Sequence, residues 1–129
     1  MKKIFILFVA IVIYNNSFCQ SGIFKYESNM FFTKEPTSET TKDYNAYHLI
    51  IIDYNKHTVS IYPGNFKADI IEENSTSENG NYKNVLIPCL DSDQKKCSII
   101  VNFKDSKPII FTVSYDVIDY VYNISKVKE

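Results

Sequence analysis

The fold is decided by residues 82–104, YKNVLIPCLDSDQKKCSIIVNFK, where two apolar runs flank a short polar break. The runs Tyr82–Leu90 and Lys95–Lys104 are rich in Val, Ile and Phe, a composition typical of β-strands. The break Asp91-Ser92-Asp93 resembles the start of a calcium-binding loop, but lysines stand where further oxygen ligands belong. We therefore interpret it as the polar turn of a β-hairpin.

The two cysteines of this stretch predict its register. When Cys89 lies opposite Cys97, the aliphatic side chains on the same face also pair, because Ile87 meets Ile99 and Val85 meets Val101. A slip of one residue would separate the cysteines and move the aliphatic residues to the other face. One register therefore satisfies both sets of residues.

A second hairpin is predicted around the two-residue turn Asn55-Lys56. That turn places Ile52 opposite Val59, and Ile50 opposite Ile61, so four aliphatic side chains share one face. We expect this face to belong to the hydrophobic core.

The rest of the chain continues the same pattern of strands and turns. Eight strands are predicted: Ile23–Phe32, Ala46–Tyr54, His57–Pro63, Phe66–Glu72, Tyr82–Leu90, Lys95–Lys104, Pro108–Asp116 and Asp119–Val127. Two longer polar segments, Thr33–Asn45 and Glu73–Asn81, are predicted to be surface loops. The predicted fold is all-β, a small antiparallel meander of about seven or eight strands that forms a β-sandwich or an up-and-down barrel.

The first nineteen residues predict an export signal. Lys2 and Lys3 precede the uncharged apolar run Ile4–Tyr14, which is too short to span a bilayer, and Ser17 and Cys19 suit a cleavage site before Gln20. We therefore expect a signal peptide over residues 1–19 and a single exported β domain over residues 20–129, periplasmic or extracellular and without a transmembrane span.

Export bears on the three cysteines. In an oxidising compartment an isolated pair favours a disulfide, so we predict one between Cys89 and Cys97. Cys19 offers an alternative to secretion, because a lipid on a cysteine after a signal would anchor the protein to the outer membrane. Phe18 precedes Cys19 where such signals carry a small residue, so this alternative is the less favoured one.

Composition argues against several classes of function. Without residues 1–19 the chain has 12 Lys against 15 Asp and Glu, and the whole sequence contains no Arg. Since nucleic-acid affinity rests on neutralising phosphates, we expect no nucleic-acid partner. His48 and His57 are the only histidines, and neither stands in a metal-binding or nucleophile-activating motif. We therefore predict no catalytic residue, no metal ligand and no cofactor, with His48 at the rim of the core and His57 beside a turn.

Tyrosine is the one functional signal in the composition, with ten Tyr and no Trp. Tyr115, Tyr120 and Tyr122 cluster near the C-terminus, and Tyr120 and Tyr122 fall on one face of a strand. Because Tyr offers a large amphipathic contact at little entropic cost, these three residues are a candidate binding surface for a protein or a glycan.

The expected function is therefore non-catalytic binding or a structural role in the cell envelope. One alternative is a lipocalin-like carrier, in which a closed barrel holds a small apolar ligand. Another is a hydrolase whose site is assembled from distant positions. An interior cavity in a closed barrel would favour the carrier, and a polar cleft joining His48 to a carboxylate would favour the enzyme.

Overall fold

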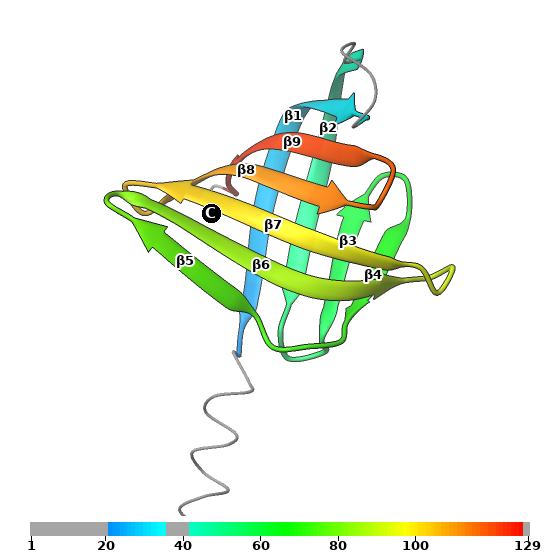
Figure 1. Cartoon of the computed structure of the whole chain (residues 1–129). Coiled ribbons are helices and arrows are strands. Elements are labelled where there is room, and N and C mark those ends of the chain that lie inside the picture. The colour runs from blue at the N-terminus through cyan, green and yellow to red at the C-terminus, as the bar shows by residue number, and fades with distance from the viewer. Residues whose placement is uncertain (1–20, 36–41, 128–129) are drawn as a thin grey trace, which may run out of the picture.

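The structure is a computed structural model that describes residues 21–35 and 42–127. The predicted signal peptide, residues 1–19, and the alternative lipid anchor at Cys19 lie outside the described residues. Every regular element within those ranges is a strand and neighbouring strands are antiparallel, which confirms the all-β prediction (Figure 1). The strands are β1 (Ile23–Lys34), β2 (Lys42–Asp53), β3 (Thr58–Tyr62), β4 (Phe66–Ile70), β5 (Ser75–Asn79), β6 (Tyr82–Asp91), β7 (Lys96–Lys104), β8 (Lys107–Ser114) and β9 (Asp119–Lys126).

Two long-range pairings close the sheet into a barrel. Successive strands are neighbours from β1 to β4 and from β6 to β9, while β1 also pairs with β9 and β4 pairs with β6. The architecture is thus an eight-stranded barrel, which agrees with the up-and-down barrel among the two predicted architectures. β5 is added to the outside, because it pairs with the first half of β6 while β4 takes the second half. In Figure 1, β6 to β9 cross β1 to β4 at a steep angle.

Both predicted hairpin registers are confirmed. In β2 and β3, Ile52 lies opposite Val59 and Ile50 opposite Ile61, and all four side chains are at most 2% exposed. In β6 and β7 the pairs Val85–Val101, Ile87–Ile99 and Cys89–Cys97 also form as expected. The alternation of side chains and the short turns were therefore sufficient to set these local pairings.

The predicted disulfide is absent from the structure. Cys89 and Cys97 lie directly opposite each other, but both are free, buried thiols. The sequence pattern determines which residues are neighbours, whereas formation of the S–S bond also needs an oxidant.

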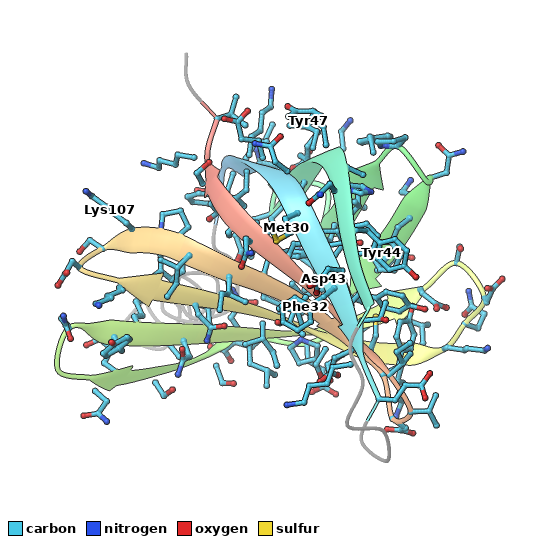
Figure 2. All side chains as sticks on the ribbon, turned by 90° about the horizontal axis from the view of Figure 1, so that it is seen from above. Met30, Phe32, Asp43, Tyr44, Tyr47 and Lys107 are labelled. Carbon is cyan, nitrogen blue, oxygen red and sulfur yellow. The ribbon has the colours of Figure 1, made fainter. Side chains whose placement is uncertain are left out.

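The two predicted surface loops are partly strands. β1 continues to Lys34 and β2 begins at Lys42, so most of the described part of Thr33–Asn45 extends the β1–β2 ladder. Figure 2 shows Phe32, Asp43 and Tyr44 on this pair of strands. In the second segment, β5 forms although all of its side chains are exposed. Neither segment carries the apolar alternation of a core-facing strand. Both form strands nevertheless, because main-chain hydrogen bonds to a neighbouring strand hold them and do not depend on the side chains.

The core fills the middle of the barrel and leaves its ends less full. Phe111, Ile50, Ile99 and Val59 have no exposed surface. A hollow of about 130 Å³ lies at the end that contains the β2–β3 and β7–β8 turns. The opposite end, which contains the β3–β4, β6–β7 and β8–β9 turns, has a cavity of about 810 Å³.

Candidate functional site

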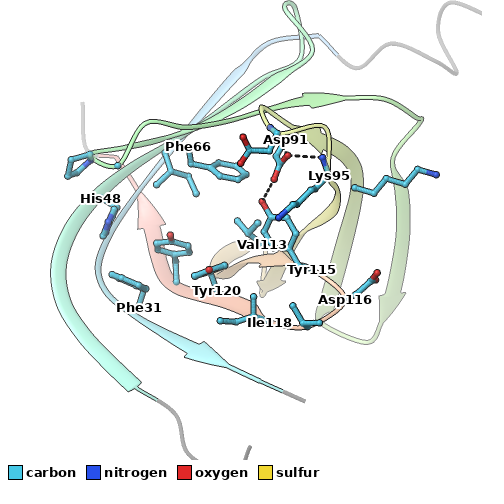
Figure 3. A pocket seen from close by; sticks show the side chains of 17 residues that line it. Phe31, His48, Phe66, Asp91, Lys95, Val113, Tyr115, Asp116, Ile118 and Tyr120 are labelled. Carbon is cyan, nitrogen blue, oxygen red and sulfur yellow. Dashed lines mark hydrogen bonds between the residues drawn. The ribbon is translucent and has the colours of Figure 1, made fainter. Parts of the chain in front are cut away.

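The large cavity at the second end of the barrel is hereafter called the cup (Figure 3). Its base is formed by Ile61 of β3 and Val113 of β8, which are both almost fully buried. Its walls are mainly aromatic, and its rim is formed by the turns that join β3 to β4, β6 to β7 and β8 to β9. The aromatic residues of the wall are Phe31, His48, Phe66, Tyr115, Tyr120 and Tyr122.

Four aromatic rings pack against one another on one side of the cup, and three of them, Phe31, His48 and Tyr122, line it. The rings of Phe31 and Tyr122 stack at a centroid distance of 5.1 Å. His48 stands edge-on to both, at 5.0 Å from Phe31 and 5.4 Å from Tyr122. Tyr44 stacks on Phe31 at 4.8 Å. Because such contacts fix ring orientation as well as bury area, this part of the wall is preformed.

A break in the strand register directs Phe31 into the cup. Ser28 pairs with His48 but Met30 pairs with Asn45, so the register shifts between Ser28 and Met30. The register against β9 also shifts between Ser28 and Met30, and beyond this point Phe31 lies opposite the inward-facing Tyr122. Ser28 Oγ donates a hydrogen bond of 2.9 Å to the Met30 carbonyl oxygen at this point. A strict alternation from the buried Ser28 would have turned Phe31 outward.

His48 is half-buried in the wall, which agrees with its predicted position at the rim of the core. Its Nδ1 donates a hydrogen bond to the Ala46 carbonyl oxygen at 3.3 Å. In the neutral ring this leaves Nε2 as a hydrogen-bond acceptor. His57 is exposed in the β2–β3 turn at the other end of the barrel, so the two histidines do not meet.

Asp91 connects the β6–β7 turn to β8. Its Oδ1 accepts main-chain hydrogen bonds from Lys95 at 2.8 Å and Asp93 at 2.9 Å, and its Oδ2 accepts one from the Tyr115 hydroxyl at 2.7 Å. These donors hold the pKa of the Asp91 carboxyl below its ordinary value, and the Lys95 N–H makes the largest contribution. Burial, and then the bond to Asp91, raise the pKa of Tyr115. Asp91 is therefore an ionised carboxylate whose two oxygens are already engaged.

The structure brings together all three predicted tyrosines. Tyr115, Tyr120 and Tyr122 line the cup, and the rings of Tyr115 and Tyr120 make an edge contact at 6.3 Å. Tyr120 and Tyr122 share a strand face as predicted, but that face is the interior wall of the barrel and not an outer surface. Burial raises the pKa of Tyr122 to about 12, so its hydroxyl is protonated at neutral pH.

The two thiols lie in the interior and are weak nucleophiles. Cys89 is 1% exposed and Cys97 is 5% exposed. Burial first, and then the neighbouring Cys97, raise the pKa of Cys89 to about 12. Since the thiolate is the reactive form, the structure gives these cysteines no feature of a catalytic thiol. Among residues 21–35 and 42–127, no group of three or more His, Cys, Asp or Glu side chains is placed to hold a metal ion.

Several cup residues were missed by the sequence analysis. Phe66 could have been found, because it has the same parity as the buried Ala68 on a predicted strand. Phe31 could not have been placed by alternation, since the register shift reverses its direction. Lys95 was predicted to begin a strand, whereas the structure places it in the β6–β7 turn at the rim of the cup.

Comparison with known proteins adds no family. The chain matches no protein-family model, no curated protein and no solved structure. In the described part of the chain, no helix has the length and apolar character needed to cross a membrane.

Proposed function

We propose that the protein binds a small, largely apolar ligand in the cup, as a carrier or sensor without catalytic activity. The observation that carries the proposal is a closed barrel whose middle is packed while one end keeps a cavity of about 810 Å³. Sites for small molecules are concave, mostly apolar and usually preformed, with volumes of roughly 300–1,000 Å³. The cup has each of these features, and its aromatic wall offers stacking surfaces.

The contacts of two polar residues, His48 and Asp91, support binding over catalysis. His48 is tied through Nδ1 to the main chain and packs edge-on against Phe31 and Tyr122. Asp91, the most buried carboxylate of the cup, already accepts three hydrogen bonds from its own turn and from Tyr115. Their bonds serve the shape of the wall. We therefore expect the His48→Gln, His57→Gln double variant to fold and still to bind, with an affinity changed only as far as loss of the His48 ring reshapes the wall.

The test is a titration with N-phenyl-1-naphthylamine, a neutral apolar probe that fluoresces in apolar surroundings. We expect saturable binding of one probe per chain. Val113→Phe fills the base of the cup and should weaken binding at least tenfold. Its matched control is Val101→Phe on β7, because Val101 is also 2% exposed but lines the small hollow at the other end.

Two outcomes would overturn the proposal: failure of the probe to saturate on the wild type, or equal weakening by both valine variants. Because overpacking costs about 1–3 kcal/mol, each variant is first checked by thermal melting. Tyr120→Ala, which enlarges the cup from a half-buried position, provides a second test if Val113→Phe does not fold. It should change the affinity for the probe, whereas Tyr47→Ala on the exposed face should not.

We also propose that the protein acts outside the cytosol, in the periplasm or the medium, with Gln20 as the first mature residue. The lysine-led apolar segment before Gln20 supports this location. N-terminal sequencing of exported protein should begin at Gln20. A mature chain that begins with lipid-modified Cys19 would contradict it.

A further inference from the structure

A lysine, Lys95, lies at the mouth of the cup, and its main chain is fixed by two hydrogen bonds to Asp91. Lys95 accepts a 2.9 Å hydrogen bond from the Asp91 N–H, and its own N–H donates one of 2.8 Å to Asp91 Oδ1. From this fixed point in the β6–β7 turn its side chain extends over the cup toward Tyr115 (Figure 3). The ammonium group of Lys95 therefore lies where a ligand would enter.

The Lys95 ammonium is not neutralised by an ion pair. Among the described residues, no carboxylate forms an ion pair with it within 4 Å. The oxygens of Asp91 accept hydrogen bonds from the main-chain N–H groups of Lys95 and Asp93 and from the Tyr115 hydroxyl, and the Lys95 charge only helps to lower the pKa of this carboxyl. Asp93 and Asp116 are also at the rim, where both are exposed to water. Lys96, the next residue, starts β7 and also lines the cup, so the rim carries two lysines, of which Lys95 belongs to the turn.

Below Lys95 the lining of the cup is mostly apolar, and its buried carboxylate, Asp91, has both oxygens occupied by hydrogen bonds. The aromatic wall and the aliphatic base supply most of the lining, and the Tyr122 hydroxyl is neutral because its pKa is about 12. A ligand that fits both parts has an apolar body for the wall and one negative charge at its outer end.

Building on the proposed function, we propose that the ligand is an amphipathic monoanion and that Lys95 selects it by binding its anionic group. A carboxylate or a sulfonate would serve equally, because each accepts charge-assisted hydrogen bonds from an ammonium group. Lys95 acts at the solvent-exposed mouth, so its effect on affinity is modest and depends on salt.

The experiment compares three probes that share one aromatic body and differ in charge. They are 2-naphthoate, 2-naphthalenemethanol and 2-naphthylmethylammonium, each used to displace N-phenyl-1-naphthylamine at neutral pH. We expect wild-type protein to bind the anion about three- to tenfold more tightly than the alcohol. This preference should shrink as salt rises from low to high ionic strength.

Two lysine variants identify the residue responsible. Lys95→Met keeps the apolar stem and removes the charge, and it should make the affinities for the anion and the alcohol equal without weakening the alcohol. Lys107→Met, at an exposed residue that starts β8 at the other end of the barrel, makes the same change in net charge and should preserve the preference.

The outcomes separate this inference from the proposed function. Equal affinity of wild-type protein for the anion and the alcohol would overturn the role of Lys95 while leaving the cup as a binding site. Tightest binding of the ammonium probe would overturn it as well and would point to Asp93 and Asp116. Loss of the preference in both lysine variants would show a general effect of net charge. Failure of N-phenyl-1-naphthylamine itself to bind would instead contradict the proposed function.

Discussion

At the scale of single residues, the Asp91–Tyr115 hydrogen bond carries the most structural consequence. It joins the turn after β6 to the end of β8, two segments separated by 24 positions in the chain. The same bond fixes Tyr115 in the wall of the cup. Together with the two main-chain hydrogen bonds in the turn, it means that both carboxylate oxygens of Asp91 accept hydrogen bonds. A single hydroxyl thus links the rim of the cup to its wall.

We predict that Tyr115→Phe lowers the melting temperature by roughly 4–8 °C, because Asp91 Oδ2 loses its donor in a partly buried place. The matched control is Tyr120→Phe in the same wall. No hydrogen bond from the Tyr120 hydroxyl occurs among the described residues, so its melting temperature should stay within about 2 °C of the wild type. Equal shifts in the two variants would contradict the role assigned to the Asp91–Tyr115 bond.

At the scale of elements, the β2–β3 hairpin forms the layer of core beneath the cup. Ile52 is 2% exposed and faces Val59 across the hairpin, while its neighbour Ile51 faces the opposite side and is half-buried. The two isoleucines therefore offer the same chemical change in two environments.

We predict that Ile52→Ala lowers the free energy of unfolding by about 2–5 kcal/mol, since it removes buried methyl groups and leaves a cavity. Ile51→Ala should cost about 1 kcal/mol or less because that side chain already has access to water. Urea denaturation measures both values. A larger loss for Ile51→Ala would mean that the face has been assigned the wrong way round.

β5 is the element least bound to the rest of the molecule. All five of its residues are exposed, and it pairs with β6 alone. The barrel is closed without it, because β4 pairs with the second half of β6.

We predict that β5 opens without unfolding of the barrel, as expected for a segment with few buried contacts. In hydrogen–deuterium exchange, the amides of Ser75–Asn79 should exchange far earlier than those of the Ile87–Ile99 pair in β6 and β7. Equal protection in the two regions would show that β5 is part of the cooperative core.

At the scale of the whole molecule, stability at high pH follows from tyrosines buried inside the barrel. Burial raises the pKa of Tyr26 and of Tyr122 from 10.0 to about 12. The unfolded chain ionises these groups first as the pH rises, so their ionisation favours unfolding. Their full contribution to stability is present below pH 10 and is lost as the pH approaches 12.

We predict that ionisation of each of these two tyrosines lowers the free energy of unfolding by about 2–3 kcal/mol as the pH rises from 10 to 12. The urea midpoint should therefore fall steeply over this range. Tyr26→Phe should reduce the fall, whereas Tyr47→Phe, at a residue that is 52% exposed, should not. An unchanged midpoint up to pH 12 would contradict the burial of both phenols.

The sequence by itself determined the local pairings. Alternation with a period of two, together with short polar turns, placed Ile52 opposite Val59 and Cys89 opposite Cys97, because each pairing depends on one turn and its two flanking strands. For the same reason the shared face of Tyr120 and Tyr122 was correctly predicted, although not what that face would meet.

Only the tertiary structure decided that the chain closes and that one end stays hollow. Closure depends on the β4–β6 and β1–β9 pairings, which join distant segments through main-chain hydrogen bonds that any residues can make. The cup exists where inward side chains of several strands fail to fill the space between them, and it includes Phe31 only because a register shift reverses that residue's direction. A cavity is a property of the assembled barrel, so no single strand of the sequence encodes it.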